Sequence, residues 1–454
     1  MTSDSPITAA PFARGLLALA GLLGLTAAAC ERPFVEISTP SIEIVSPDLT
    51  TAFFSEQFQL VVSASSFRDV SRVTLNGVEM TRDEVNGNWS SSLDLGNGLN
   101  PFVVQAFDID EVASTDTFYA LRLGVGRVAS PPSLPFGRGG HSATSLPNGS
   151  VLIAGGAPTV TSAAIDDIQI VSANGQTITP LPVQLETPRV GHTASLLPDG
   201  RVLFAGGASF ASPSEVSALV ETVELYDPDT GTLSTLEFSG PAIRRVYHTA
   251  DVRLVDGQTI IDLYGGRGDV AYTPESRWGI RSDIRSFRLN GNTLESLSPA
   301  VGGRLIEPVW GHTLTALAIA DPTPVRYLIV AGLFEPSFES EVAAIIDFSN
   351  PLGLVPEIVS EPTITRSQHA AIRLRSGFVA LFGGRTLDGP PTQSVEIFAE
   401  QANQFFTVPV TNLQPSARYG HALAHLSGGR ILVSGGFDAA GNGISSSEIY
   451  IIEI

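Results

Sequence analysis

Six stretches of similar sequence, each opened by a histidine, recur along the last three quarters of the chain. In each, small and aliphatic residues follow the His, then come a turn, an aliphatic run and, in five copies, a Gly-Gly pair. Successive histidines are 51, 56, 64, 57 and 52 residues apart. A period near fifty residues is typical of a propeller blade, so the repeat predicts an all-β ring of sheets. The histidines are His141, His192, His248, His312, His369 and His421.

Each repeat is expected to fold as four antiparallel strands. The first begins at the His, as in HTASLL, and a turn such as Asp199-Gly200 leads into the second, as in VLFAGG. A variable loop follows, then a third strand such as TVELYDPDTG and a short fourth strand. The last repeat stops at Ile454, after its third strand. We therefore expect residues 126–134 to supply the missing fourth strand and close the ring without an open edge.

The repeats resemble those of kelch propellers, such as the central domain of galactose oxidase, in their basic residue, His-like position, Gly-Gly pair and Tyr position. The Tyr position holds Tyr226, Phe287, Phe398 and Tyr450, whereas the family's Trp is replaced by residues such as Leu233 and Leu294. The resemblance covers residues 126–454 and implies a six-bladed kelch-type propeller. The Gly-Gly pairs are Gly155-Gly156, Gly206-Gly207, Gly265-Gly266, Gly383-Gly384 and Gly435-Gly436.

Residues 41–124 have a different pattern. Runs such as QFQLVVSAS and VSRVTLNG alternate apolar and polar residues between Gly, Asn, Asp and Pro turns, which predicts a β-sandwich. The stretch GLNPFVVQAFDIDEVAS resembles the late strands of bacterial immunoglobulin-like modules. Its acidic turn, with Asp108, Asp110 and Glu111, has fewer ligands than a calcium ion takes, so we interpret it as a solvated loop.

At the N-terminus, Arg14 precedes the apolar stretch GLLALAGLLGL, and TAAAC ends at Cys30, the only cysteine of the chain. This pattern resembles a bacterial lipoprotein signal peptide. The resemblance implies a signal peptide over residues 1–29, a lipidated Cys30 and a tether over residues 30–40. The protein would then be held in the bacterial cell envelope, at the outer membrane or cell surface. Ala27 departs from the family's preferred Leu, and an ordinary secretory signal is the alternative.

Composition excludes several functions. The chain has no lysine, which rules out Schiff-base chemistry, and its formal charge of −20 disfavours nucleic acid as a partner. Copper radical oxidases related to galactose oxidase need a Tyr crosslinked to a Cys, and here the only Cys is the expected anchor. The sequence predicts neither a metal nor a cofactor. We expect the six histidines to have structural roles, placed around the ring without converging, and the paired glycines to permit close backbone packing.

Five arginines stand three residues before a repeat His, in loops that emerge on the same face as the loops after Gly-Gly. A ring of guanidinium groups there would hold acidic ligands or sugars, and the alternative is that each Arg pairs with a local acid. The loop of the third repeat adds Arg267, Tyr272, Arg277 and Trp278, which are typical binding anchors. The five arginines are Arg138, Arg189, Arg245, Arg366 and Arg418.

The sequence therefore predicts an exported, lipid-anchored, monomeric protein whose propeller loop face binds a glycan or a protein. No catalytic residue is assigned, and catalysis is not favoured. One alternative is a kelch-type mutarotase or other carbohydrate-active enzyme, which would need an acid and base pair in the axial pocket. A structural protein of the cell envelope is the other. Fold resemblance alone does not decide among them.

Overall fold

The computed structural model describes residues 39–128, 131–210, 219–268, 279–297, 305, 308–317, 326–335, 338–348, 356–386, 389–409 and 415–454. The described residues form strands and two short 3-10 segments, Glu400–Ala402 and Ser427–Gly429, with no α-helix. None of the described helical segments is long or apolar enough to cross a membrane.

The first eight strands form two four-stranded sheets with a shared core. Alternating residues such as Leu60, Val62, Val73 and Val104 are fully buried between the sheets, as the period-two pattern predicts. One sheet has the order β1 (Ser41–Ser46), β2 (Gln57–Ser65), β6 (Trp89–Asp94), β5 (Thr81–Arg82); the other has the order β4 (Val78–Glu79), β3 (Val70–Leu75), β7 (Gly98–Asp108), β8 (Ala113–Arg122).

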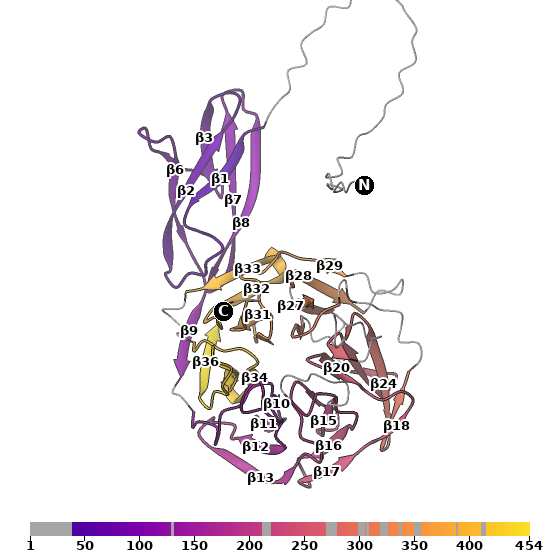
Figure 1. Ribbon diagram of the computed structural model, residues 1–454. Helices are drawn as coiled ribbons and strands as arrows, with labels where there is room; N and C mark the ends of the chain where they lie inside the picture. Colours follow the sequence, from indigo (N-terminus) through magenta and orange to yellow (C-terminus); the bar gives the residue numbers. More distant parts are fainter. Residues whose placement is uncertain are drawn as a thin grey trace, which may run out of the picture. The chain divides into compact units, whose positions relative to one another are not determined.

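The described residues from 124 onward form six larger sheets arranged around a common centre (Figure 1). The sheets are β10 (Ser142–Ser145), β11 (Val151–Ala154), β12 (Asp167–Val171), β13 (Ile178–Gln184); β14 (Thr193–Leu196), β15 (Val202–Ala205), β16 (Glu224–Asp227), β17 (Thr232–Thr235); β18 (Glu237–Ser239), β25 (Thr293–Ser296), β24 (Ile284–Asn290), β21 (Gln258–Tyr264), β20 (Thr249–Val255); β26 (Thr313–Ala316), β27 (Arg326–Glu335), β28 (Phe338–Asp347), β29 (Glu357–Ile358); β30 (Ala370–Arg373), β31 (Val379–Phe382), β32 (Val395–Ala399), β33 (Gln404–Val408); and β34 (Ala422–His425), β35 (Arg430–Ser434), β36 (Ser447–Glu453), β9 (Gly124–Val128). A small ribbon has the order β19 (Arg245–Val246), β22 (Arg267–Gly268), β23 (Gly279–Ile280).

Hydrophobic cores lie between neighbouring sheets. Leu152 of β11 and Phe204 of β15 share one such core, and each second strand is almost completely buried because sheets cover both of its faces. The last sheet packs on the first in the same way, with Leu432 of β35 beside Ile153 of β11. The innermost strands contact one another around the centre, and β10 contacts both β14 and β34.

The chain's two ends meet in the last sheet. Strand β36 pairs antiparallel with β9, in a register that runs from Ile449 opposite Val128 to Glu453 opposite Gly124. The segment expected to pair here was 126–134, but the paired strand begins two residues earlier and ends at Val128. Leu134 rejoins this sheet through a hydrogen bond from its N–H to the Ser445 carbonyl, 2.8 Å. No open edge therefore separates the first and last repeats.

Candidate functional site

The five arginines that precede the repeat histidines lie inside the sheets, where each is at most 1% exposed. Each guanidinium donates to the carbonyl of the first Gly in its own Gly-Gly pair and to an acidic side chain on the third strand or, for Asp283, immediately before it. These contacts favour the alternative interpretation of the five arginines, that each pairs with a local acid, over ligand binding. The pairs are Arg138–Asp167, Arg189–Glu224, Arg245–Asp283, Arg366–Glu396 and Arg418–Glu448.

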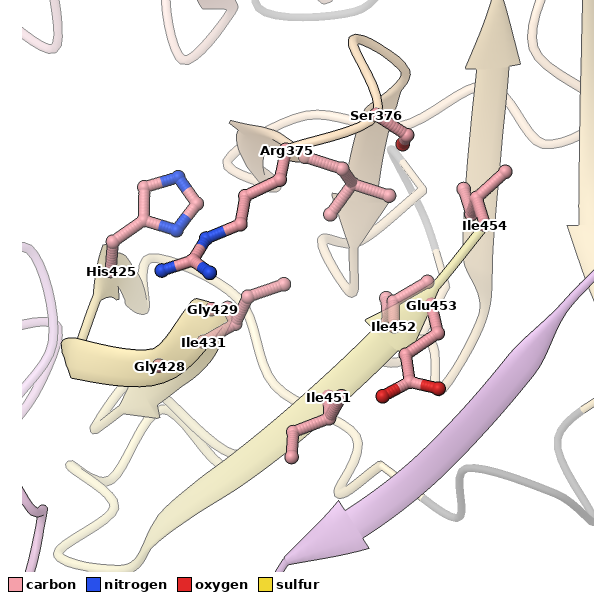
Figure 2. Close-up of a pocket in the computed structure, with 11 residues that line it drawn as sticks. Arg375, Ser376, His425, Gly428, Gly429, Ile431, Ile451, Ile452, Glu453 and Ile454 are labelled. Carbon is pink, nitrogen blue, oxygen red and sulfur yellow. The ribbon is translucent and has the colours of Figure 1, made fainter.

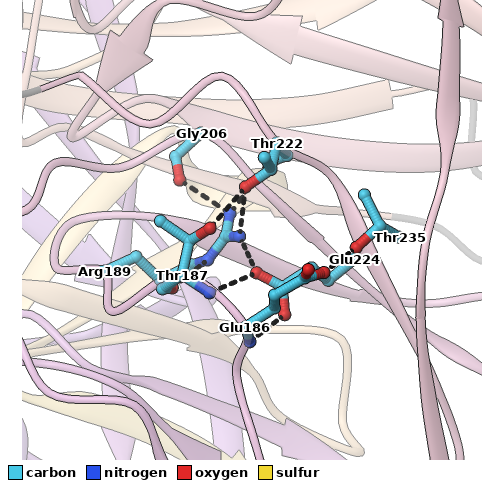
Figure 3. A network of polar contacts seen from close by, with 7 residues as sticks. All are labelled: Glu186, Thr187, Arg189, Gly206, Thr222, Glu224 and Thr235. Atoms are coloured by element: carbon cyan, nitrogen blue, oxygen red, sulfur yellow. Dashed lines mark hydrogen bonds and ion pairs between the residues drawn. The ribbon is translucent and has the colours of Figure 1, made fainter.

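The pair in the second repeat illustrates how these charges are satisfied (Figure 3). Arg189 and Glu224 form an ion pair in which both side chains are completely buried. Arg189 Nη1 also donates to the carbonyls of Gly206 and Thr222, each at 3.1 Å. The Glu224 carboxylate accepts from the backbone N–H of Glu186 at 2.7 Å. Burial lowers the pKa of Arg189 and the adjacent carboxylate opposes this, so the Arg stays charged at neutral pH.

The fourth repeat replaces both charges by apolar side chains. Val309 stands where the other repeats have Arg, and it shares a buried core with Ala344. Ala344 lies opposite Ile329 on the neighbouring strand, as Glu224 lies opposite Phe204 in the second repeat. A buried charge without its partner is costly, so the two positions lose their charges together. The ion pair is thus a structural unit of the repeat.

All six repeat histidines line one pocket of about 140 Å³ on the axis of the ring. The sequence predicted that they stay apart around the ring, whereas the structure gathers them around this small cavity. Five of them hydrogen-bond a Ser or Thr hydroxyl through Nε2 at 2.9 to 3.2 Å. Burial lowers the pKa of all six, to about 3 for His192, so the imidazoles are neutral at pH 7.

These contacts give the histidines a structural role between repeats. In four cases the hydroxyl belongs to the residue that follows the His of the preceding repeat, as Ser142 does for His192. Across the described ranges, no group of three or more His, Cys, Asp or Glu side chains is placed to hold a metal ion. The paired glycines pack closely, as expected: a Cβ on Gly155 would lie 2.5 Å from the Arg189 carbonyl oxygen.

The residues immediately before the six histidines form a closed ring of backbone hydrogen bonds. Each N–H donates to the carbonyl of its counterpart in the preceding repeat at 2.7 to 3.1 Å, and Gly140 donates to Gly420 to complete the circle. All six have φ between 51° and 65°. Four are glycines, for which this left-handed conformation costs little, but Tyr247 and Gln368 are not. The ring is Gly140, Gly191, Tyr247, Gly311, Gln368 and Gly420.

Aromatic and arginine side chains lie around Tyr247, and Gln368 lines the same pocket. The ring centroid of Tyr247 lies 5.5 Å from that of Trp310, and the Arg267 guanidinium lies 5.0 Å over the same Trp. Arg385 lies 4.6 Å over Tyr419. The positive charges of Arg267 and Arg385 both act on Tyr247, while burial raises its pKa to about 12. We call this group the axial mouth: Tyr247, Arg267, Trp310, Gln368, Arg385 and Tyr419.

The axial mouth combines one residue expected from the sequence with five that were missed. Arg267 was a binding candidate; its companions Tyr272, Arg277 and Trp278 lie outside the described residues, as does Cys30. Two of the missed residues, Tyr247 and Gln368, had a signal in the sequence, because the position before each repeat His is Gly in the other four repeats. A side chain at such a position is forced into the left-handed backbone conformation, and outliers of this kind cluster at functional sites.

A second pocket, of about 350 Å³, lies where the last two repeats and the end of β36 meet (Figure 2). Arg375 and His425 line one side, and Ile452 and Ile454 line the other. His425 donates through Nε2 to the Arg373 carbonyl at 2.9 Å. Burial lowers the pKa of His425, so it is neutral at pH 7. The wall of this pocket thus presents the Arg375 guanidinium, the Glu453 carboxylate, a neutral imidazole and aliphatic side chains.

A buried carboxylate cluster distinguishes the third repeat. Tyr327 of β27 donates its hydroxyl to the carboxylate of Asp251 on β20. On the neighbouring strand, Asp262 accepts from Arg253 Nε at 2.6 Å. Burial and the charge of Asp262 raise the pKa of Asp251 to about 6. The protonation of the Asp251 carboxyl therefore changes near pH 6.

Comparison with known proteins identifies the fold. No family model matches the chain. The solved structure of YjhT superposes with a TM-score of 0.52 and 13% identity, covering 70% of this chain and 95% of that one. A fungal alcohol oxidase of the AA5 family, in complex with copper, has a TM-score of 0.46 and 10% identity, covering 91% and 76%.

Among curated proteins, the Rho GTPase-activating protein gacHH of Dictyostelium discoideum is 25% identical over 166 residues, which span 36% of this chain and 10% of that protein. At these identities the likenesses bear on the fold alone. Together with the ring of sheets, the superposition with YjhT shows that the chain has a kelch-like β-propeller fold.

Proposed function

We propose that this is an exported, lipid-anchored binding protein: a six-bladed kelch-type propeller, preceded by an immunoglobulin-like sandwich, that binds an acidic glycan or an acidic protein segment at the axial mouth. The supporting observation is the pair of guanidinium groups stacked on aromatic rings beside the axial pocket, Arg267 on Trp310 and Arg385 on Tyr419. Arginines held in this way are preorganised to bind carboxylates.

The charge balance also supports a negatively charged ligand. The protein carries a formal charge of −20, and the five arginines before the repeat histidines are neutralised inside the sheets. Two cationic side chains beside one pocket therefore contrast with an acidic surface. Trp310 and Tyr419 are 8% and 5% exposed, so the aromatic rings position the arginines and leave the contact itself to the guanidinium groups.

The protonation states in the axial pocket favour binding over the mutarotase alternative. The six histidines have pKa values lowered by burial, and the pKa of Tyr247 is raised to about 12. These groups neither gain nor lose a proton near neutral pH, whereas a general acid or base works best when its pKa lies near that pH. A carbohydrate-active enzyme would be supported only by turnover of acidic sugars.

The test is binding of the wild-type protein and of two variants to arrays of acidic glycans and acidic peptides. Arg385→Gln removes the charge, and Trp310→Leu removes the surface on which Arg267 is stacked; both are expected to lower affinity about tenfold or more. Arg201→Gln is the matched control, since Arg201 pairs with Asp199 at 2.6 Å in a hairpin turn and is expected to leave affinity unchanged. Equal binding by the wild-type protein and all three variants would rule out the axial mouth as the ligand-binding site.

A further inference from the structure

Exposed apolar side chains are concentrated on the sandwich. Of the ten large hydrophobic side chains exposed among the described residues, five lie between residues 45 and 109, although the sheets of the propeller contain far more of the chain. Phe67 is 90% exposed and Ile109 is 59% exposed. Scattered single residues of this kind need no explanation, but two that share one tip of a domain form a surface.

Phe67 and Ile109 lie in neighbouring turns that are joined to each other. Phe67 follows β2 and Ile109 follows β7, and the N–H of Ile109 donates to the Asp69 carbonyl at 3.0 Å. An ion pair between Arg68 and Asp110 also joins the two turns. These contacts hold both apolar side chains at the same end of the sandwich, which we call the apolar tip (Phe67 and Ile109).

The chain enters the sandwich at this same end. Ser41, the first residue of β1, lies opposite Ser65, the last residue of β2, two positions before Phe67. The residues between Cys30 and Ser41 can span at most about 40 Å when fully extended. A lipid attached at Cys30 therefore keeps the apolar tip within reach of the membrane surface, whatever path the tether takes.

We propose that the apolar tip inserts into the interface of the lipid bilayer that holds the protein, so that the sandwich stands on the membrane. This inference rests on the proposed lipid anchor. Local charge indicates the kind of surface: Arg68 pairs with Asp110, and Arg72 pairs with Glu111 through two hydrogen bonds of 2.7 Å. With its cations neutralised, the tip contacts lipid through apolar burial and is expected to insert into zwitterionic bilayers without requiring anionic lipid.

The experiment attaches the lipid chemically, so that it does not depend on acylation in the cell. A chain beginning at Cys30, its only thiol, is coupled to a maleimide with a single 14-carbon acyl chain and mixed with phosphatidylcholine vesicles. One such chain gives marginal, reversible binding, so a second contact is visible in the partition coefficient. The Phe67→Ser/Ile109→Ser double variant is expected to bind at least about tenfold more weakly than the wild-type protein.

Ile358→Ser is the matched control, because Ile358 is 66% exposed on a propeller strand and its loss is expected to leave partitioning unchanged. The depth of insertion is measured separately by tryptophan fluorescence. Brominated phosphatidylcholine is expected to quench the fluorescence added by the Phe67→Trp substitution but not that added by the Ile358→Trp substitution. Unchanged partitioning of the double variant, equal quenching at both positions, or self-association of the lipid-free chain through the tip would overturn the inference. Mass spectrometry of the protein from cells tests whether Cys30 carries a lipid. A negative result there would contradict the proposed anchor and is independent of the result with vesicles.

Discussion

The Nε2 atom of His192 lies 3.0 Å from the Oγ atom of Ser142, the residue that follows the histidine of the preceding repeat. The same relationship links His248, His312 and His369 to Thr193, Thr249 and Thr313. It is interrupted where the residue after a repeat His is Ala, at Ala370 and Ala422. His141 forms its hydrogen bond with Ser434 instead. In contrast, neither ring nitrogen of the buried His421 has a well-formed hydrogen bond.

Ala370→Ser is therefore expected to stabilise the protein, because the new hydroxyl satisfies a buried imidazole nitrogen of His421. A hydrogen bond that satisfies a buried group contributes about 1 kcal/mol to the free energy of unfolding. Denaturant titration measures the change. Ala422→Ser is the control, since His141 already bonds Ser434, and it is expected to gain little. An equal gain in both variants would contradict the relationship.

Arg366→Val is expected to lower the free energy of unfolding by roughly 3 to 5 kcal/mol, because it leaves the buried Glu396 without its partner. Adding Glu396→Ala recreates the Val and Ala combination that the fourth repeat has at Val309 and Ala344. The double variant is expected to recover a large part of the loss. A double-mutant cycle from urea unfolding measures the coupling, and purely additive losses would argue against a paired unit.

Asp251 is expected to make stability depend on pH. Its pKa is raised from 3.8 to about 6 in the folded protein, so the protonated form is favoured by folding. The contribution is therefore complete below about pH 4 and is lost as pH rises through 6, on the order of 3 kcal/mol. In Asp251→Asn this decrease should be absent when unfolding free energies are compared between pH 4 and pH 7. A parallel decrease in variant and wild type would assign it to another group.

Gln368→Gly is expected to weaken ligand binding without destabilising the fold. Gln368 has a φ of 51°, a conformation that costs a non-glycine residue about 1 kcal/mol, and glycine offsets this by its greater freedom when unfolded. Asp256→Gly is the control, because Asp256 has the same φ of 51° in a hairpin turn outside the axial mouth. Both variants should keep stability within about 1 kcal/mol, and only the first should lose affinity. Loss of affinity in both variants would show that the lower affinity does not come from a change in the axial mouth.

The propeller-like fold could be predicted because repetition is visible in a linear sequence. The strands, the hairpin turns and the closing strand before the first repeat follow from local pattern, and the structure moves the last of these only to Gly124–Val128. The role of the arginine ring could not be decided from the sequence, which left ligand binding and pairing with a local acid both open. Sequence spacing put Arg138 and its counterparts in the correct connections, but whether each guanidinium faces solvent or a carboxylate depends on a residue some thirty positions away.

By itself, then, the sequence determined what repeats: the period, the turn residues and the aliphatic strands that require a ring of sheets. Only the tertiary structure decided what converges, since residues from six repeats meet at the axis through contacts between separate sheets. At the axis, the residues that differ from their counterparts in the other repeats define the candidate site. Tyr247 and Gln368 are inconspicuous in their own repeats, yet closure of the ring puts them beside one pocket, with Arg267 and Arg385 acting on Tyr247. Local pattern fixes how each sheet forms, whereas packing between sheets fixes which side chains share a site.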